Sequence, residues 1–201
     1  NNRVINVGSN LGTFPRANIF MEMYIMRRTD FISCIYEMVN VGTYSYFQDF
    51  ITEEVNNIQI GGYEFTGYLK CINSIQSYYE ASRDLLNPEI AKELLYSNNK
   101  IFTKEKNQAP TIYKDNANVK NSFIASGCVI DGVVENSIIF RKVHVGKDTV
   151  IKDSIIMQNC IIDSDVVLNN VILDKNVTIS EGKELRGDEN YPMVLEKNLS
   201  I

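Results

Sequence analysis

The apolar and polar positions follow two different periods on either side of residue 110. Before this point, apolar residues recur at the three- and four-residue spacing of helices, and short unbroken apolar runs favour strands. Thr29 and Ser74 stand where N-caps would begin two of these helices, and Gly42 stands where a glycine would end the first. The predicted helices span residues 30–41, 46–55, 75–86 and 89–96. The predicted strands span residues 17–26, 58–60 and 63–70, the last two meeting at Gly61-Gly62 in a turn or in one bulged strand.

From Pro110 onward the helical spacing gives way to an internal repeat. Asn136-Ser137-Ile138-Ile139 returns as Asp153-Ser154-Ile155-Ile156 and again as Asn170-Val171-Ile172-Leu173, and the offset in the numbering is the same, 17, both times. The earlier copy, Asn121-Ser122-Phe123-Ile124, precedes the first at an offset of 15, which predicts a two-residue deletion in one corner. Inside one repeat the aliphatic residues follow one another at spacings of six, six and five, at Ile139, Val145, Ile151 and Ile156.

A hexad with one aliphatic residue per side indicates short strands that turn through a third of a circle each. Three sides close a triangular coil, and the aliphatic side chains stack inward along a continuous core. The residues between them are Asn, Asp, Gly, Ser and Lys, which tolerate tight corners and left-handed backbone. The pattern therefore predicts a left-handed parallel β-helix of hexapeptide repeats, with about four coils over residues 112–181. A β-sandwich would alternate with a period of two and has no reason for so long a repeat.

Composition and charge exclude several classes of protein. The 201 residues are 44% hydrophobic and 22% charged, as in ordinary globular domains, and the apolar runs are far shorter than the ~18 residues of a membrane span. The net charge is −5 and the basic residues are scattered, so we expect no nucleic-acid partner. The four cysteines fit neither a zinc site nor a disulfide framework, which favours reduced thiols in the cytoplasm. No signal peptide is evident, and a start at Asn1 instead of Met is typical of a fragment or a processed form.

Hexapeptide β-helices occur in acyltransferases, in γ-type carbonic anhydrases and as terminal domains of sugar nucleotidyltransferases. An acyltransferase would need a histidine base, and His144 is the one histidine in the chain. It lies between Val143 and Val145, which the repeat points inward, so we expect His144 to face solvent or a neighbouring subunit. A carbonic anhydrase of this type needs three zinc-binding histidines, which this sequence lacks.

Several motifs in order resemble the ADP-glucose pyrophosphorylases (glucose-1-phosphate adenylyltransferases). Gly67 to Ala81 (GYLKCINSIQSYYEA) is similar to that family's G-Y-W-R-D-V-G-T-I-x-x-Y-Y-E-A segment. Gln48 to Ile51 resembles its D-F-x-x-D-I-I-P segment, and Met21 to Met26 resembles M-G-I-Y-x-F. The stretches 124–131, 134–137 and 143–146 of the predicted β-helix also resemble the family.

The resemblance implies an α/β arrangement, the C-terminal portion of a nucleotidyltransferase domain over residues 1–95, followed by a linker at 96–110 and the β-helix with a tail at 111–201. It implies a reaction of ATP with glucose 1-phosphate to ADP-glucose and pyrophosphate, with Mg²⁺ in active members. The family's glycine-rich nucleotide loop is absent, and we interpret Gly8 to Gly12 as a plain turn. We therefore expect no catalytic residue and no cofactor in this chain.

The departures from the family pattern fall on the positions that the resemblance assigns to substrate and metal. Cys71 replaces an aspartate metal ligand, and Lys70 and Ser74 replace the neighbouring arginine and threonine. A neutral thiol is a poor ligand for Mg²⁺, which prefers oxygen. In the sugar-side motif S-M-G, Phe20 adds bulk, and the carboxylate of Glu22 would repel a sugar phosphate. The structural alternatives are that Cys71 is a small core residue in an enzyme whose metal is held elsewhere, and that Phe20 packs in a strand.

The sequence therefore predicts a regulatory, non-catalytic subunit of glycogen biosynthesis that acts through a homo- or hetero-tetramer with a catalytic ADP-glucose pyrophosphorylase subunit. The first alternative is a catalytically active adenylyltransferase subunit, and the second is a hexapeptide acyltransferase. Arg141, Lys142 and Lys147 are candidate anion contacts, with a solvated corner as the simpler interpretation. The apolar tail at 191–195 predicts that the last coil is covered, by a partner or by this tail.

Overall fold

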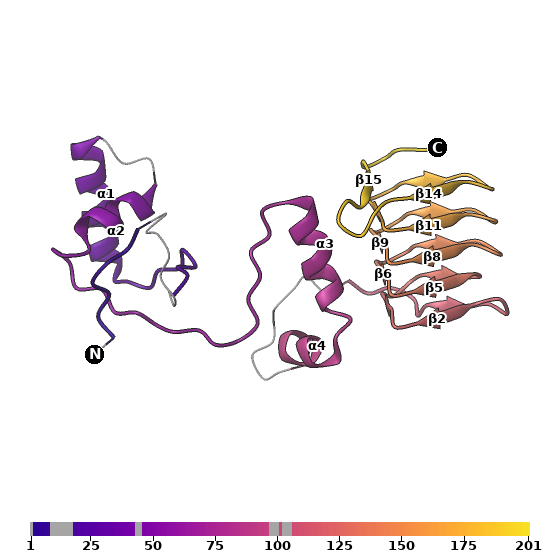
Figure 1. Ribbon diagram of the computed structural model, residues 1–201, viewed down its shortest axis with the longest axis horizontal. Coiled ribbons are helices and arrows are strands. Elements are labelled where there is room, and N and C mark those ends of the chain that lie inside the picture. Colours follow the sequence, from indigo (N-terminus) through magenta and orange to yellow (C-terminus); the bar gives the residue numbers. More distant parts are fainter. Residues whose placement is uncertain (1, 9–17, 43–45, 97–100, 102–105) are drawn as a thin grey trace. The chain divides into compact units, whose positions relative to one another are not determined.

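The computed structural model describes residues 2–8, 18–42, 46–96, 101 and 106–201, and these fall into two compact units. The first unit is Asn1–Gly67 and the second is Tyr68–Ile201. Figure 1 shows the helices of both units and the stacked coils that make up most of the second. Within these described residues, no helix combines the length and the apolar character needed to cross a membrane.

The first unit contains two helices, α1 (Arg28–Val41) and α2 (Phe47–Glu54), close to the predicted ranges. Gly42 ends α1 with φ of 71°, and its N–H donates to the carbonyl of Met38, so the predicted glycine stop is confirmed. The predicted N-cap at Thr29 is wrong. The helix begins at Arg28, two residues before the predicted start, after an extended Arg27 whose side chain donates to Asp30 at 3.1 Å. That contact spans the first turn, so Thr29 lies inside the helix.

The three predicted strands of this half do not form in the residues that the structure describes. Residues 18–26, 58–60 and 63–70 contain no strand, and Ala17 lies outside the described residues. The pairing present is an antiparallel bridge between Arg3 and Gly61, with Val4 N–H donating to Ile60 O at 2.9 Å. An apolar run shows that a segment can be buried. A strand also needs a neighbouring backbone segment that supplies hydrogen-bond partners along its length. Residues 9–12 of the predicted Gly8–Gly12 turn also lie outside the described residues.

The second unit opens with α3 (Ile75–Asp84) and α4 (Pro88–Leu95). Ser74 caps α3 as predicted: its hydroxyl accepts from the Ser77 N–H at 3.0 Å. The helix ends two residues before the predicted Leu86. Asn87 caps the next helix through Glu89 N–H, and Pro88 occupies its first position.

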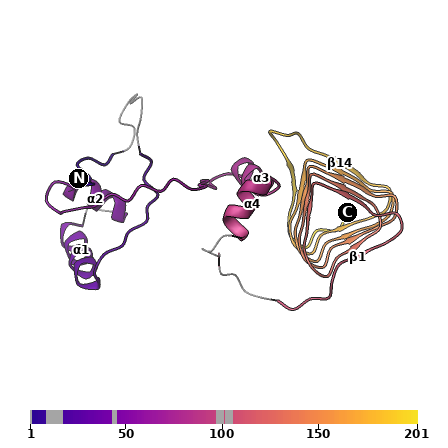
Figure 2. The ribbon, with the colours of Figure 1, turned by 90° about the horizontal axis from the view of Figure 1, so that it is seen from below.

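Fifteen short strands then form a parallel β-helix, and the view along its axis is a triangle (Figure 2). The first face contains β1 (Ile112–Tyr113), β4 (Val129–Ile130), β7 (His144–Val145), β10 (Ile161–Ile162) and β13 (Thr178–Ile179). The second face contains β2 (Asn118–Lys120), β5 (Val133–Glu135), β8 (Val150–Lys152), β11 (Val167–Asn169) and β14 (Glu184–Arg186). The third face contains β3 (Phe123–Ile124), β6 (Ile138–Ile139), β9 (Ile155–Ile156), β12 (Val171–Leu173) and β15 (Met193–Leu195).

The strand register confirms the predicted repeat. Ile138 pairs with Ile155 and Ile155 with Ile172, each at the predicted offset of 17, whereas Phe123 pairs with Ile138 at an offset of 15. The deletion lies at the corner Asp131-Gly132, which has two residues where the next coil has four (146–149). The predicted aliphatic positions form the core: Ile139, Val145, Ile151 and Ile156 are at most 1% exposed.

The β-helix continues beyond residue 181, because β14 and β15 add a further coil. The apolar tail predicted at 191–195 is part of the last coil and not a cover over it: Met193–Leu195 form β15, in which Leu195 is buried, and Ile201 beyond it packs against the core. The two compact units meet between Gly67 and Tyr68 and not at the expected linker, 96–110, because α3 and α4 belong to the same unit as the β-helix. A polar segment indicates exposure to solvent, but it carries no information on which helices pack together.

Candidate functional site

The segment that resembles the family's substrate and metal motif, Lys70 to Ser74, leads directly into α3. Ser74 is used structurally. Its hydroxyl accepts from Ser77 N–H, and its own N–H donates to the Ser77 hydroxyl at 2.9 Å, which closes a capping box. The backbone N–H groups of Ser74 and Ser77 are thereby satisfied, and this fixes where the segment ends and the helix begins.

Lys70 is bound within its own chain. Its ammonium lies 3.1 Å from the Asp84 carboxylate, which also accepts from the Tyr68 hydroxyl at 2.8 Å. Partial burial acts to raise the pKa of Asp84, but the hydrogen bonds from Tyr68 and Lys70 and the charge of Lys70 outweigh it, so the pKa lies below its usual value. Burial and the contact with Asp84 raise the pKa of Tyr68 to about 12. The charge of Lys70 is therefore already balanced by a carboxylate.

Cys71 is an exposed, unbonded thiol. Its exposure contradicts the alternative that it is a small core residue. Magnesium prefers oxygen ligands and near-octahedral geometry, so a thiol at this position does not fit the ion. Among the described residues, no group of three His, Cys, Asp or Glu side chains is arranged to hold a metal.

Phe20 and Glu22 belong to the other compact unit. The Phe20 ring meets Tyr24 edge to face at 5.2 Å, and Tyr24 meets Phe47 at 4.9 Å. Phe20 therefore packs in an aromatic cluster and not in a strand, which corrects the structural alternative for this residue. Glu22 has φ of 55°, a left-handed conformation that is uncommon for residues other than glycine. With Tyr24 and Phe47, Glu22 lines a hollow of about 360 Å³.

The predicted site positions thus belong to both compact units. Lys70, Cys71 and Ser74 are neighbours in the segment before α3, and Phe20 and Glu22 lie in the first unit. The structure gives Lys70 and Ser74 contacts of their own within the chain, whereas the Cys71 thiol stays exposed.

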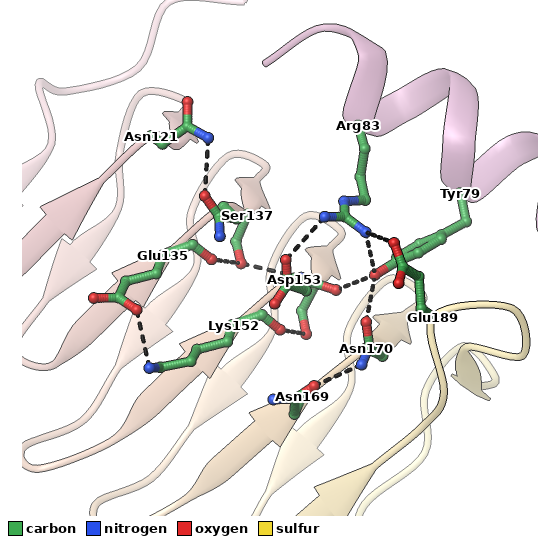
Figure 3. Close-up of polar contacts among 12 residues, drawn as sticks. Tyr79, Arg83, Asn121, Glu135, Ser137, Lys152, Asp153, Asn169, Asn170 and Glu189 are labelled. Atoms are coloured by element: carbon green, nitrogen blue, oxygen red, sulfur yellow. Dashed lines mark hydrogen bonds and ion pairs between the residues drawn. The ribbon is translucent and has the colours of Figure 1, made fainter. Parts of the chain in front are cut away.

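A buried contact fixes α3 on the third face of the β-helix, between β9 and β12. Tyr79, at the centre of α3, is 1% exposed and packs with Ile155, Ile172 and Tyr78. Its hydroxyl donates to the Asp153 carbonyl at 2.5 Å and lies 2.9 Å from the Asn170 side chain (Figure 3). Burial raises the pKa of Tyr79, and the nearby Arg83 guanidinium acts in the opposite direction.

Arg83, one helical turn after Tyr79, adds a charged contact to the same junction. Its Nη2 donates to Asp153 Oδ1 at 2.9 Å, and its guanidinium lies over the Tyr79 ring at 5.3 Å from the centroid. Beside this junction is an open cleft of about 820 Å³, lined among others by Lys70, Gln76, Glu80 and Arg83. Because both cations are paired with carboxylates, the cleft presents no excess of positive charge.

Sequence reasoning missed this junction, and the repeat pattern alone does not identify it. In Ile138-Ile139, Ile155-Ile156 and Ile172-Leu173 two large apolar residues are adjacent. Because neighbouring residues of a strand point to opposite sides, one of each pair must face outward. Ile155 and Ile172 are nonetheless at most 3% exposed, because α3 covers them. The other faces also carry adjacent aliphatic residues, and Ile161 of the pair Ile161-Ile162 on the first face is 46% exposed, so the doubling allows a covered face without identifying which face is covered.

The three candidate anion contacts do not form one site. Arg141 and Lys142 lie at the corner between β6 and β7, and Lys147 lies at the next corner, between β7 and β8. Lys142 takes a left-handed conformation with φ of 59°, and Lys147 is exposed at 3.9 Å from its neighbour Asp148. This arrangement favours the solvated corner. His144 faces outward from β7 as expected, paired on either side with Val129 and Ile161.

Comparison with known proteins places these features in a family context. A family model described as GlmU-like, C-terminal hexapeptide matches residues 107–191. The chain is 43% identical over 179 residues to the "Glycogen biosynthesis protein GlgD" of Bacillus subtilis (strain 168), which is 89% of this chain and 52% of that protein. It is 37% identical over 146 residues, 73% of this chain and 42% of the relative, to the GlgD of Geobacillus stearothermophilus. It is 41% identical over 91 residues, 45% of this chain and 24% of the relative, to a glucose-1-phosphate adenylyltransferase of Mycoplasma mobile. The chain spans about half the length of the two glycogen biosynthesis proteins.

Proposed function

We propose that the chain belongs to a regulatory subunit of glucose-1-phosphate adenylyltransferase, because it is similar over most of its length to glycogen biosynthesis proteins and over a shorter stretch to a glucose-1-phosphate adenylyltransferase. The subunit acts in glycogen biosynthesis, in the cytoplasm, by assembling with a catalytic subunit. Its own contribution to the transfer of the adenylyl group is small or nil.

One observation carries the regulatory role: the buried attachment of α3 to the β-helix. The segment Lys70–Ser74 leads into the N-terminus of α3, and Tyr79 at the centre of α3 is buried against β9 and β12. A packed helix transmits a displacement as a rigid element because interiors are close-packed. A change in the environment of the β-helix therefore reaches the substrate-motif segment through α3.

The side chains of that segment support a non-catalytic role. Cys71 offers a thiol where the family resemblance has a carboxylate, and Lys70 is held by Asp84 at 3.1 Å. In the first unit, Glu22 places a negative charge where the resemblance has glycine. Each of these changes weakens the binding of a metal-bound, anionic substrate without disturbing the fold, because all three lie outside the buried cores.

The proposed mechanism is a difference in binding between two states of the catalytic partner. If the β-helix packs better against one state, it shifts the partner toward that state. The coupling free energy in such systems is ~1–3 kcal/mol, which corresponds to a 5–150-fold change in affinity. The partner is a catalytic ADP-glucose pyrophosphorylase subunit, and the assembly is a tetramer.

The test is ADP-glucose synthesis by the full-length natural protein, alone and mixed with the catalytic subunit of the same organism. We expect background activity alone and a changed kcat, substrate affinity or effector response in the mixture. Robust activity of the protein alone would overturn the proposal in favour of a catalytic subunit. A mixture that behaves as the catalytic subunit alone, with no complex in sedimentation, would overturn the regulatory role.

A pair of variants tests whether the missing carboxylate at position 71 limits activity on its own or together with the other changes in the site. Cys71→Asp introduces the carboxylate, and Cys71→Ser changes the thiol to a hydroxyl of similar size without one. We expect both to stay at background when assayed alone, because Glu22 and the Lys70–Asp84 pair also depart from the family pattern. Strong activity in Cys71→Asp alone would show that this one position limits catalysis.

A further inference from the structure

The last coil of the β-helix contains an insertion at the corner on which α3 is docked. Val171 of β12 pairs with Met193 of β15, an offset of 22 in the numbering, whereas the two preceding pairings on this face, β12 with β9 and β9 with β6, have an offset of 17. The five additional residues fall between β14 and β15. This is the corner that holds Asp153 and Asn170 in the coils below, the two residues that meet Tyr79. We call residues 187–192 the corner loop.

The corner loop has a defined structure of its own. Asp188 and Tyr191 form an antiparallel bridge, each N–H donating to the other's carbonyl at 3.0 Å. The Asp188 side chain accepts from Asn190 N–H at 2.9 Å. Gly187 admits the loop to the coil because a Cβ there would lie 2.3 Å from the Asn170 carbonyl oxygen. The loop is thus anchored in the β-helix and projects as a tight turn.

Glu189, at the tip of this turn, reaches both ends of α3. Its backbone carbonyl accepts from Gln76 Nε2 at 3.3 Å. Its carboxylate lies 3.8 Å from Arg83 Nη1 (Figure 3). Gln76 and Arg83 are seven residues apart, which is about 10 Å along a helix at ~1.5 Å per residue. One residue of the β-helix therefore contacts the first and the last turn of α3.

We propose that the corner loop is a latch that fixes the orientation of α3 on the β-helix. The buried Tyr79 holds the centre of the helix and the Arg83–Asp153 contact holds its last turn, which leaves the first turn free to swing about these two anchors. The contact of Glu189 with Gln76 removes this freedom, and its carboxylate adds to the hold on Arg83. Because the segment Lys70–Ser74 continues from the N-terminus of α3, the latch also sets the position of that segment.

The contacts of the corner loop with α3 contribute little to the stability of the fold, so they can break while the β-helix stays folded. The Glu189 carboxylate side chain is 78% exposed, and exposed ion pairs contribute little to stability. The main apolar contact of α3, Tyr79 with Ile155 and Ile172, is independent of the loop. Loss of the loop should therefore free the orientation of α3 without unfolding the β-helix.

The test is hydrogen exchange measured on the full-length protein. Deletion of residues 188–192 leaves Gly187 as the corner residue and restores the register of the preceding coils. We expect amides of α3 to exchange about tenfold faster in this variant, while strands β6 to β12 keep their protection. Glu189→Gln, which keeps the backbone contact with Gln76, should give a smaller increase. Tyr191→Ser is the matched control, since Tyr191 lies in the same loop and is 84% exposed.

Unchanged exchange in α3 after the deletion would overturn the latch. Loss of protection throughout the β-helix would also overturn it, because the loop would then be required for the fold. The consequence for regulation rests on the proposed function and has its own measurement, the response of the catalytic subunit to the deletion variant. A failure of the wild-type protein to bind that subunit would reject the proposed function and leave the exchange result as the test of the latch.

Discussion

Single residues at the corners of the β-helix decide which backbone conformations the chain can take. Asn136, Asp153 and Asn170 are left-handed and lie above one another, as do Asn159 and Asn176 at another corner. Short polar side chains tolerate this conformation through local hydrogen bonds. Asn159 Nδ2 donates to Asn176 Oδ1 at 3.0 Å, so the corner residues also link successive coils. In the first unit, Glu22 is left-handed at a position where the family resemblance has glycine, so the backbone shape is kept while the side chain differs.

Gly132 is the residue that makes the shortened corner possible. A Cβ at this position would lie 2.3 Å from the backbone carbonyl of Thr149, which cannot move without breaking the coil above. We expect Gly132→Ala to destabilise the second unit by about 1–3 kcal/mol, the cost typical of overpacking. Thermal unfolding measures the loss. Gly182→Asn is the matched control, because Gly182 is left-handed with nothing near its Cβ position, and Asn tolerates that backbone. Equal melting temperatures for the two variants would contradict the explanation.

The contact of Asp84 with Tyr68 and Lys70 predicts that the stability of the fold depends on pH. The pKa of Asp84 is lower in the folded chain than in the unfolded one, so its stabilising effect is present above the unfolded pKa, near 4, and is lost as the pH falls through the folded value. Asp84→Asn should reduce stability at pH 7 by on the order of 1 kcal/mol, after allowance for solvent screening. The difference between wild type and variant should shrink below about pH 4. Thermal unfolding between pH 3 and pH 7 checks this, and a constant difference would show that the carboxylate charge is not responsible.

At the scale of the elements, the coils are joined by buried hydroxyl groups as well as by strand hydrogen bonds. The Ser154 hydroxyl, which is buried, donates to the Lys152 carbonyl at 2.6 Å and accepts from the Val171 N–H of the next coil at 3.1 Å. Ser137 makes the equivalent contact in the coil below, where its hydroxyl accepts from Ser154 N–H at 3.0 Å. Figure 3 shows Ser137 beside this corner. These hydroxyl groups satisfy backbone donors at the point where the chain turns from one face to the next.

Removing one of these hydroxyl groups leaves a backbone N–H buried without a partner. We therefore expect Ser154→Ala to cost about 1–3 kcal/mol of unfolding free energy, the range for an unsatisfied buried donor. Chemical denaturation of the variant measures the cost. Ser126→Ala, at an exposed position of the same β-helix, should change the stability by less than about 0.5 kcal/mol. A similar small change in Ser154→Ala would indicate that water replaces the hydroxyl.

The elements that could be predicted from the sequence are those whose hydrogen bonds are local or repeated. The Ser74 cap, the Gly42 stop and the register of the coils each depend on neighbours in the chain or on the next coil. The predicted strands at 58–60 and 63–70 depended on partners that no local pattern identifies, and they do not form. The docking of α3 brings Tyr79 to Asp153, which is distant in the sequence, and no pattern in the sequence identified this contact. For the candidate site, sequence identified Lys70 and Cys71 as departures, but the Asp84 contact of Lys70 required the fold.

At the scale of the whole molecule, the three faces of the β-helix have different surroundings. The third face is covered by α3 at Ile155 and Ile172. The second face carries an ion-pair ladder, in which Glu135 lies 3.8 Å from Lys120 and 3.0 Å from Lys152. The first face presents Ile161, 46% exposed, next to His144. The β-helix is thus attached to the rest of its unit by one face, and the other two present different chemistry to their surroundings.

This arrangement predicts where the chain can be divided. A fragment of residues 68–201 keeps the whole second unit, and we expect it to unfold cooperatively at the melting temperature of that unit in the full chain. A fragment of residues 106–201 loses α3, which exposes Ile155 and Ile172. Full burial of one such side chain is worth about 1.5–3 kcal/mol, so the shorter fragment should melt at a lower temperature and bind a hydrophobic dye. Calorimetry and dye binding on both fragments check the prediction. Equal stability of the two fragments would mean that α3 does not stabilise the β-helix. The buried contact of Tyr79 with Ile155 and Ile172 would then no longer support the proposed regulation.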